Sequence, residues 1–326
     1  MNIGVYGFGA IGRLIAKSAF ERGLEVSAVI DINPELVGRD IGDILGLGER
    51  VGVRVSSDPK ALRGVDVVLH ATGSYLDRVY GQLVKSIDAG ADVVSTCETL
   101  AYPYYRYPSL ARKLDARAKG RGVTIIGTGI NPGFLLDTLV IAVATPLGVV
   151  DRIHAVRSLD AAKRRLPFQK KIGVGLEPGR AKELLGKGEI TGHVGYAESV
   201  LLIADAAGLE LSRVEEGQEI VVADKPVESH GVRVGAGLNL GLTGYGVGFR
   251  DGREVVRVEF RAYVGASEFE SIVVEGPNGS VEWRSTGTPG DVGTASVVLS
   301  VAEAIASQPP GLALMTDLIP FRIRFT

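Results

Sequence analysis

Cysteine and histidine are scarce in this chain, and their scarcity excludes several kinds of site. The only cysteine, Cys97, permits no internal disulfide and no metal site built from several thiolates. The four histidines, His70, His154, His193 and His230, lack the short spacing that is typical of metal-ligand pairs. We therefore expect no bound metal.

A strong charge excess and long apolar runs are also missing. The formal net charge is −2, which gives no indication of a nucleic-acid partner or of an anionic membrane. No apolar stretch approaches the ~18 residues that a membrane-spanning helix needs, and the apolar start of the chain is interpreted as a strand rather than a secretory signal. We expect a cytoplasmic enzyme. The scarcity of Asn and Gln beside many Arg and Glu suggests a thermophilic source.

The most informative segment that is present lies at the start of the chain. A short apolar run, Ile3 to Tyr6, leads into Gly7-Phe8-Gly9-Ala10-Ile11-Gly12, and an amphipathic helix pattern follows. In G-x-G-x-x-G between a strand and a helix, the first glycine permits the turn, the second lets a diphosphate approach the backbone, and the third lets the helix pack closely. The N–H groups and dipole of the helix then face the phosphates. The residues predicted to bind a dinucleotide here are Gly7, Gly9, Ala10, Ile11 and Gly12.

An acidic residue follows the second apolar run at the spacing that suits a nucleotide. Asp31 comes directly after Glu25 to Ile30, nineteen residues after Gly12. A carboxylate there accepts hydrogen bonds from the hydroxyls of an adenine ribose, and it would repel a 2′-phosphate, so it favours NAD over NADP. Arg39 lies eight residues further on and could receive such a phosphate, so NADP stays open as the cofactor.

The order of strand and helix patterns predicts two domains. Apolar runs alternate with helical patterns at short spacing in the first part of the chain, which predicts a doubly wound parallel sheet of the Rossmann type. Later runs joined by turns predict a second, α+β domain built on a mostly antiparallel sheet. A late helix, Thr294 to Ala306, is expected to pack back on the first domain. The expected domains are residues 1–134 plus 294–326 for dinucleotide binding and 135–293 for substrate binding and oligomerisation.

Individual elements are expected from the same patterns. Val65 to Ala71 is a strongly apolar strand candidate, and Tyr75 to Ala89 is helical in pattern. Pro34 to Leu45 is expected to form a helix, and Val232 to Phe249 is expected to form one long strand.

Polar and small residues at the strand ends are the candidate site. Ligands of open α/β sheets lie beyond the carboxyl ends of the strands. Glu98 follows an apolar strand directly and should face a nicotinamide, where a carboxylate could hold an ammonium or act as a general base on an amine or water. The alternative for Glu98 is a helix-capping or salt-bridged side chain. The further residues expected to contact the cofactor are Ala71, Thr72, Gly73, Thr96, Cys97 and Asn131.

Other reactive groups have less specific patterns. Catalysis by Cys97 is not favoured, because no histidine is placed by the sequence to activate the thiol. His193 lies in a glycine-framed loop of the second domain and could line an interdomain cleft or lie on the surface. The run Lys163 to Arg165 and the pair Lys170 and Lys171 could bind a substrate carboxylate, although a solvated basic face is commoner.

Several segments together resemble the 2,4-diaminopentanoate dehydrogenase family, an amine dehydrogenase branch related to dihydrodipicolinate reductase. With the glycine motif they span nearly the full length, and GTGINPGF and RRLPFQKK are the most particular to this family. The matching segments are VLHATGSYL (68–76), STCETLAYP (95–103), GTGINPGFLLD (127–137), KRRLPFQKKIGVGL (163–176), GHVGYAES (192–199) and MTDLIP (315–320).

The resemblance implies a reversible, NAD(P)-dependent oxidative deamination of a primary amine, similar to 2,4-diaminopentanoate, to a ketone plus ammonia. It implies that Glu98 binds the amine and transfers a proton, and we expect Phe134 and His193 to contact the substrate as well. Where the family often has a second acid after its TCE motif, this chain has Thr99.

Other functions and the assembly state remain open at this point. One alternative is an imine reductase similar to dihydrodipicolinate reductase, although the His- and Lys-bearing signature of that enzyme is missing. Others are a semialdehyde dehydrogenase of an amino-acid pathway and a non-catalytic nucleotide sensor. A homodimer or a higher homo-oligomer is expected, because exposed sheet faces in this architecture are often buried by a partner.

Overall fold

The computed structural model describes residues 1–326, and the chain divides into two compact units. The two units comprise residues 1–135 with 289–320 (unit 1) and residues 136–288 with 321–326 (unit 2). The last six residues, which we expected in the first domain, belong to unit 2. They do so because β17 (Arg324–Phe325) pairs in parallel with β7 (Val149–Val150) of that unit.

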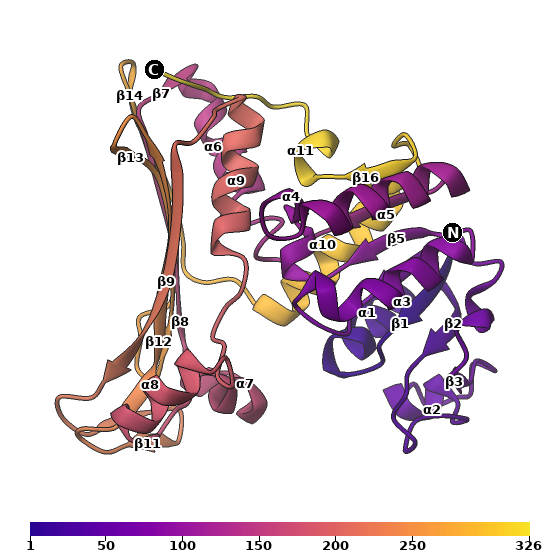
Figure 1. The fold of residues 1–326 in the computed structure, drawn as a ribbon. Helices are drawn as coiled ribbons and strands as arrows, with labels where there is room; N and C mark the ends of the chain where they lie inside the picture. The colour runs from indigo at the N-terminus through magenta and orange to yellow at the C-terminus, as the bar shows by residue number, and fades with distance from the viewer. The chain divides into compact units, whose positions relative to one another are not determined.

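Unit 1 is built on a seven-stranded sheet in which every neighbouring pair runs parallel (Figure 1). The spatial order is β16-β6-β5-β4-β1-β2-β3, so the direction of winding reverses between β1 and β4. This order confirms the predicted Rossmann sheet. The strands are β1 (Asn2–Tyr6), β2 (Glu25–Ile30), β3 (Val55–Ser56), β4 (Val67–His70), β5 (Asp92–Ser95), β6 (Thr124–Gly127) and β16 (Gly311–Ala313).

Helices cover the sheet of unit 1 and close its core. Ile15 of α1 (Ala10–Glu21) and Val298 of α10 (Gly290–Ile305) share one buried cluster with the β1 residues Ile3 and Val5. A separate cluster joins α3 (Leu76–Asp88) and α5 (Pro108–Arg121) to β5 and β6. The shorter helical segments are α2 (Ile41–Leu45), η1 (Pro59–Leu62), η2 (Glu98–Leu100), α4 (Pro103–Arg106) and α11 (Met315–Leu318).

Two expected elements are interrupted. The helix predicted for Pro34 to Leu45 is reduced to α2, because Asp40 caps a helix that begins only at Ile41: its carboxylate accepts from the Gly42 N–H at 2.8 Å. The strand predicted for Val232 to Phe249 is split into β11 (Val232–Val234) and β12 (Asn239–Arg250). The break lies at Gly237, whose φ of +79° does not fit an extended strand.

Unit 2 is built on a six-stranded sheet of order β15-β14-β8-β13-β12-β9. Only β8 and β13 run parallel, so the prediction of a mostly antiparallel sheet is confirmed. The strands not yet given are β8 (Arg152–Asp160), β9 (Arg213–Val222), β10 (Val227–Ser229), β13 (Arg253–Tyr263), β14 (Phe269–Gly276) and β15 (Gly279–Ser285). The helices are α6 (Thr138–Ala144), η3 (Thr145–Leu147), η4 (Ala161–Lys163), α7 (Leu166–Lys171), α8 (Pro178–Gly186) and α9 (Tyr196–Ala207).

Glycines of β12 let α9 lie close against this sheet (Figure 1). A Cβ on Gly244 would lie 2.2 Å from the Tyr196 hydroxyl oxygen, and one on Gly246 would lie 2.8 Å from the Tyr196 carbonyl oxygen.

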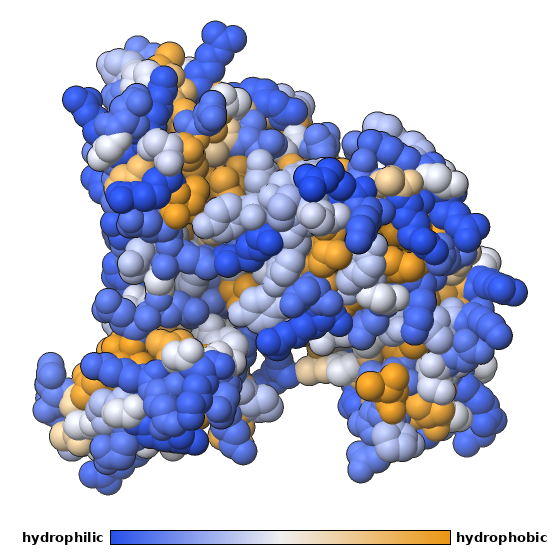
Figure 2. Space-filling model, in the orientation of Figure 1, coloured by the Kyte–Doolittle hydropathy of each residue, from blue (hydrophilic) through white to orange (hydrophobic).

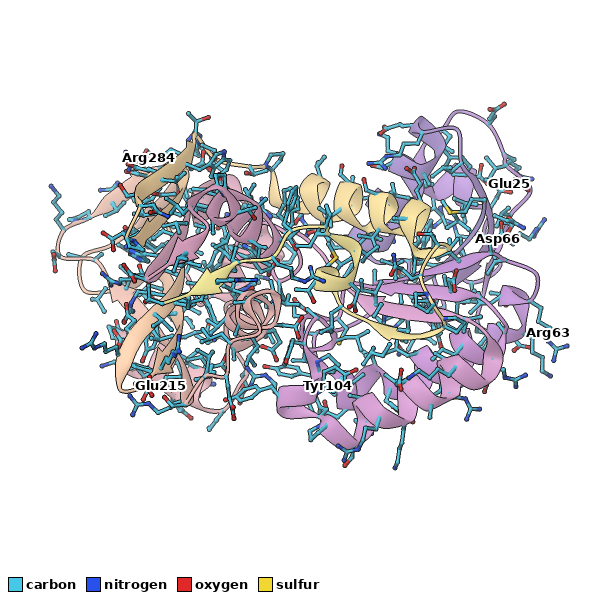
Figure 3. The ribbon with its side chains drawn as sticks, turned by 90° about the horizontal axis from the view of Figure 1, so that it is seen from above. Glu25, Arg63, Asp66, Tyr104, Glu215 and Arg284 are labelled. Atoms are coloured by element: carbon cyan, nitrogen blue, oxygen red, sulfur yellow. The ribbon has the colours of Figure 1, made fainter.

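The edge strands of the sheet carry exposed charges, among them Glu215 on β9 and Arg284 on β15 (Figure 3). Hydrophilic residues cover most of the visible surface of each unit (Figure 2). Every helix of the structure is too short or too polar to cross a lipid bilayer.

Candidate active site

The segments that follow β1, β4 and β5 contact one another at the carboxyl edge of the parallel sheet. A Cβ added to Gly7, after β1, would lie 2.6 Å from the carbonyl oxygen of Ala71, after β4. The carbonyl oxygen of Ser74 accepts a hydrogen bond of 3.1 Å from the N–H of Thr99, after β5. These contacts form a continuous row at the place where open α/β sheets bind ligands.

The glycine turn has the geometry that a dinucleotide diphosphate needs. Gly7 adopts a φ of +93°, which only glycine adopts readily. A Cβ on Gly12 would lie 1.8 Å from the carbonyl oxygen of Gly7, so only glycine allows α1 to pack this closely. Gly9 is exposed, and a Cβ there would have no heavy atom within 4 Å. The backbone is therefore open to a phosphate in front of the first turn of α1, where Ala10 is exposed and Ile11 packs against the core.

Asp31 is fixed beside this turn by two backbone groups. Its carboxylate accepts from the N–H of Phe8 at 2.5 Å and from the N–H of Asn33 at 2.8 Å. The first bond ties the end of β2 to the glycine turn. Arg39 lies exposed before α2.

Glu98 begins the 3-10 turn η2 at the carboxyl end of β5 and is half-buried. The residue after it is buried completely: the Thr99 hydroxyl donates to the Ser74 carbonyl oxygen at 3.2 Å and accepts from the Leu76 N–H at 2.8 Å. Thr99 therefore holds the loop after β5. A carboxylate at this position would lie against the carbonyl oxygen of Ser74, which it would repel. The candidate carboxylate of this segment is Glu98 alone.

Cys97 contributes its backbone to this row of loops, whereas its thiol is turned into the core. The side chain is fully buried, and burial, with the nearby charge of Glu98 as a smaller cause, raises the pKa of the thiol to about 12. A thiol with this pKa does not act as a nucleophile at neutral pH. Thr96, one residue earlier, donates its N–H to the carbonyl oxygen of His70 at 2.9 Å and keeps the loop on β4.

The segment after β6 brings two further predicted residues to unit 1. Asn131 is buried and forms a cis peptide bond with Pro132. Phe134 is 37% exposed. The start of the segment is joined to β5 because the Thr128 N–H donates to the Ser95 carbonyl oxygen at 2.8 Å.

His193 belongs to unit 2 and is partly buried. Its ring lies against Tyr196 and Phe260, with centroid distances of 4.9 and 5.0 Å, and its N–H donates to the Gln218 side chain at 3.0 Å. Burial, followed by the positive charges of Lys171 and Arg157, lowers the pKa of His193 to about 3, so the imidazole is neutral.

The sequence analysis predicted Thr72 but assigned no role to the residues bonded around it. His70, at the end of β4, is fully buried and bonds to Ser95, Gln82 and Thr72. The only indication in the sequence was a histidine inside an apolar strand. Gln82 lies twelve residues further on in α3, and no pattern joins it to the site.

A second concave surface lies at the opposite edge of the unit 1 sheet. It is lined by residues such as Asp66, Asp92 and Gly122 near the amino ends of β4, β5 and β6. Asp66 and Glu25 lie at this edge in Figure 3, whereas Tyr104 follows the carboxyl end of β5. Ligands of this fold bind at the carboxyl edge, so the candidate site is the row that contains Glu98.

Comparison with known proteins gives the relatives of the chain. Residues 134–323 match the family model of the 2,4-diaminopentanoate dehydrogenase C-terminal domain, and residues 1–95 match that of the dihydrodipicolinate reductase N-terminus. The 2,4-diaminopentanoate dehydrogenase of Acetoanaerobium sticklandii is 29% identical over 98% of this chain and 92% of that protein. An amine dehydrogenase of Streptomyces virginiae is 26% identical over 68% of this chain and 64% of its own length.

A solved structure has the same fold over nearly the whole chain. The amine dehydrogenase from Mycobacterium smegmatis covers 99% of this chain, and 97% of its own length is covered, with a TM-score of 0.85 and 22% identity. The residues of the glycine turn fit the nicotinamide dinucleotide that dehydrogenases of this fold use. The chain therefore belongs to the 2,4-diaminopentanoate dehydrogenase family, whose members are oxidoreductases acting on amines.

Proposed function

We propose that this protein oxidises a primary amine similar to 2,4-diaminopentanoate to a ketone and ammonia, with NAD as the electron acceptor. The observation that carries the proposal is the position of Glu98: a single half-buried carboxylate on the row of loops that begins at the glycine turn. The names of two relatives support the choice of substrate class: a 2,4-diaminopentanoate dehydrogenase that matches nearly the whole chain and an amine dehydrogenase that matches about two thirds of it.

The reaction needs one hydride acceptor and one group that moves protons. A bound nicotinamide would supply the acceptor for a hydride from the carbon that carries the amine. Water then adds to the resulting iminium, and the carbon–nitrogen bond breaks, so that the substrate ammonium and water give ketone, ammonium, reduced cofactor and one proton. Glu98 holds the substrate ammonium and accepts a proton from the amine or from the attacking water. The turn from Gly7 to Gly12 and the carboxylate of Asp31 hold the cofactor in place.

A screen of diamino acids and simple amines with NAD and NADP tests the proposal. We expect reduced cofactor and ammonia in equal amounts with at least one amine. Absence of turnover with the whole panel, together with tight binding of NADH, would instead indicate a nucleotide sensor.

An imine reductase is the second candidate, because residues 1–95 match the dihydrodipicolinate reductase N-terminus. The match of residues 134–323 to the other family covers more of the chain than the match of residues 1–95, and it favours amine oxidation. The two reactions differ in their need for ammonia. We expect oxidation of NADH with a ketone to depend on added ammonia, whereas an imine reductase works without it.

Asp31 should determine the choice between NAD and NADP. We expect the wild-type protein to have a lower KM for NAD, because a 2′-phosphate would approach the carboxylate. Asp31→Asn keeps an oxygen acceptor for the Phe8 N–H and removes the charge, so it should shift the ratio of the two KM values toward NADP by about tenfold. Arg39→Gln tests the alternative contact to a 2′-phosphate, and it should leave that ratio unchanged if Asp31 alone determines the preference. A wild-type preference for NADP would contradict the role of Asp31.

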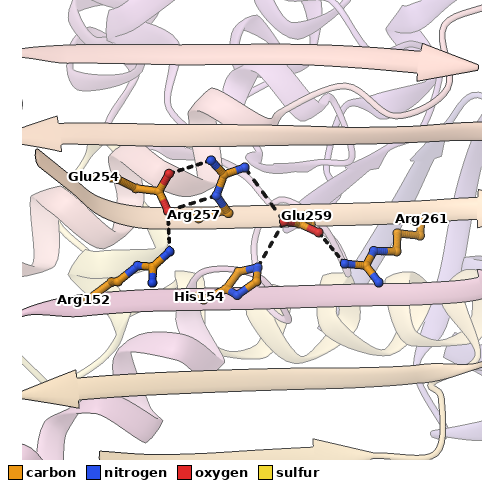
Figure 4. Close-up of polar contacts among 6 residues, drawn as sticks. All are labelled: Arg152, His154, Glu254, Arg257, Glu259 and Arg261. Carbon is orange, nitrogen blue, oxygen red and sulfur yellow. Dashed lines mark hydrogen bonds and ion pairs between the residues drawn. The ribbon is translucent and has the colours of Figure 1, made fainter.

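We also propose that the open face of the six-stranded sheet binds a second copy of the chain. On β13, Val256, Val258 and Phe260 are buried, whereas the intervening charged side chains project from the other face. Acidic and basic groups alternate there, and a two-fold related copy would place bases against acids. The residues of this charged row are Arg152, His154, Glu254, Arg257, Glu259 and Arg261 (Figure 4).

Charge reversal tests this assembly. We expect the wild-type protein to sediment as a dimer and Arg257→Glu to sediment largely as a monomer, because Arg257 lies between Glu254 and Glu259. Arg180→Glu, on the exposed surface of α8, is the matched control and should stay dimeric. A wild-type monomer, or a dimer that is unaffected by Arg257→Glu, would show that this face is not the interface.

A further inference from the structure

His70 lies at the centre of a buried hydrogen-bond network in unit 1. Its Nδ1 lies 2.8 Å from the Ser95 hydroxyl oxygen, and its Nε2 lies 2.8 Å from the Gln82 amide oxygen and 2.9 Å from the Thr72 hydroxyl oxygen. The ring is completely buried, and it forms a T-shaped pair with Tyr6, with a centroid distance of 5.7 Å and an interplanar angle of 80°. The imidazole therefore has no access to solvent or to a substrate.

The hydrogen-bond pattern fixes the tautomer of this ring. The Ser95 hydroxyl oxygen accepts from the Cys97 N–H at 3.1 Å, which leaves its own proton for Nδ1 of His70. The Gln82 oxygen is an acceptor only, so the Nε2 of His70 must carry the proton and donate it. Burial lowers the pKa of His70 to about 4, which agrees with a ring that is neutral at pH 7. His70 accepts on one side and donates on the other.

The two sides of the ring reach different parts of the candidate site. The Nδ1 side leads through Ser95 to the backbone of Cys97, the residue directly before Glu98. The Nε2 side leads to Thr72 and Gln82, and so to the loop after β4 that is predicted to contact the cofactor. The loop after β5 is thus held through Nδ1 of His70, and the loop after β4 is held through Nε2 of the same ring.

We propose that His70 is a positioning residue that holds the catalytic loop through Nδ1 and the cofactor loop through Nε2. It moves no proton in the reaction. This inference goes beyond the proposed function. It rests on that function only in treating the loop that carries Glu98 as the catalytic loop. The loop after β4 contacts the glycine turn at Gly7 whatever the substrate is.

Two half-replacements of the ring separate its two roles. In His70→Asn, the amide oxygen takes the place of Nδ1 and still accepts from Ser95, but the bond to Gln82 is lost. In His70→Gln, the amide nitrogen takes the place of Nε2 and still donates to Gln82, but Ser95 loses its acceptor. We expect His70→Asn to weaken NADH binding roughly tenfold in calorimetry with little change in kcat at saturating cofactor. We expect His70→Gln to lower kcat roughly tenfold with little change in the Kd for NADH.

Controls distinguish positioning from loss of stability. Thr124→Val removes a hydrogen bond to the Pro309 carbonyl oxygen at the amino end of β6. It should therefore lower the unfolding temperature without changing the Kd for NADH or kcat. A merely structural His70 would give the same change of Kd and kcat in both variants, or no change in either, and both results would overturn the proposal.

Nitrogen-15 NMR of the wild-type protein gives a test that needs no variant to fold. The Nε2–H tautomer should persist from pH 5 to 8, and an Nδ1–H tautomer or a protonated ring at pH 7 would refute the assignment.

The same measurements remain informative if the proposed amine oxidation fails. A wild-type protein without turnover on any amine would remove the substrate assignment. The NADH affinity of His70→Asn and the tautomer would still decide whether the ring holds the cofactor loop.

Discussion

Glu98→Gln should lower the turnover number by at least ~100-fold, the lower range for loss of a positioned acid–base group. The amide has the size of the carboxylate and fits the same half-buried place at the start of η2. It cannot take a proton from an amine or from water. Because the glycine turn is untouched, the Kd for NADH should stay within about twofold of the wild-type value. Steady-state kinetics with the best amine of the screen and calorimetry with NADH measure the two quantities.

Glu303→Gln is the matched control for Glu98→Gln. Glu303 lies on α10 of the same unit, its side chain is 51% exposed, and its partner is Arg22 at 3.6 Å. Its substitution should change neither turnover nor cofactor affinity. Near-normal turnover of Glu98→Gln would remove this carboxylate from the chemistry and leave the amine assignment without its proton-transfer group.

Two alanine substitutions in the glycine turn should have different effects: one lowers stability, and the other lowers NADH affinity in a stable protein. In Gly12→Ala the new Cβ meets a carbonyl oxygen at 1.8 Å, so α1 must move, and the free energy of unfolding should fall by about 1–3 kcal/mol. In Gly9→Ala the Cβ meets no atom of the protein, and the φ of −72° suits alanine, so stability should stay within ~0.5 kcal/mol. The methyl group at position 9 occupies the space of the diphosphate, so NADH affinity should fall at least ~10-fold, or about 1.4 kcal/mol.

Gly81→Ala provides the control for this pair. Gly81 lies in α3 with no heavy atom within 4 Å of its added Cβ, so the substitution should leave NADH binding unchanged. Urea unfolding and calorimetric titration of the three variants measure stability and affinity separately. Unchanged NADH affinity in a folded Gly9→Ala protein would place the cofactor elsewhere.

The parallel sheet and the order of its loops could be predicted because short-range patterns determine them. Gly7, Gly9 and Gly12 act within one turn, and the apolar runs that form β4 and β5 place Thr72 and Glu98 at strand ends. The same logic failed at Gly237, where a single left-handed residue splits the predicted strand 232–249 into β11 and β12.

Contacts between elements far apart in the sequence could not be predicted. The bond from His70 to Gln82 depends on how α3 packs on the sheet, and the bonds from Thr99 to Ser74 and Leu76 depend on the register of β4 and β5. Periodicity gives the face of a helix that is buried, but not the side chain that its polar residues will meet. The contact of the His193 ring with Phe260 has the same origin, since these two residues are brought together only by tertiary packing.

The most direct measurement is a titration of the wild-type protein with NADH and with NADPH, followed by cofactor fluorescence and calorimetry. We predict one binding site per chain for at least one of the two, with NADH bound more tightly. No association with either coenzyme, in a protein that unfolds cooperatively, would contradict the assignment of the glycine turn and every role that depends on it.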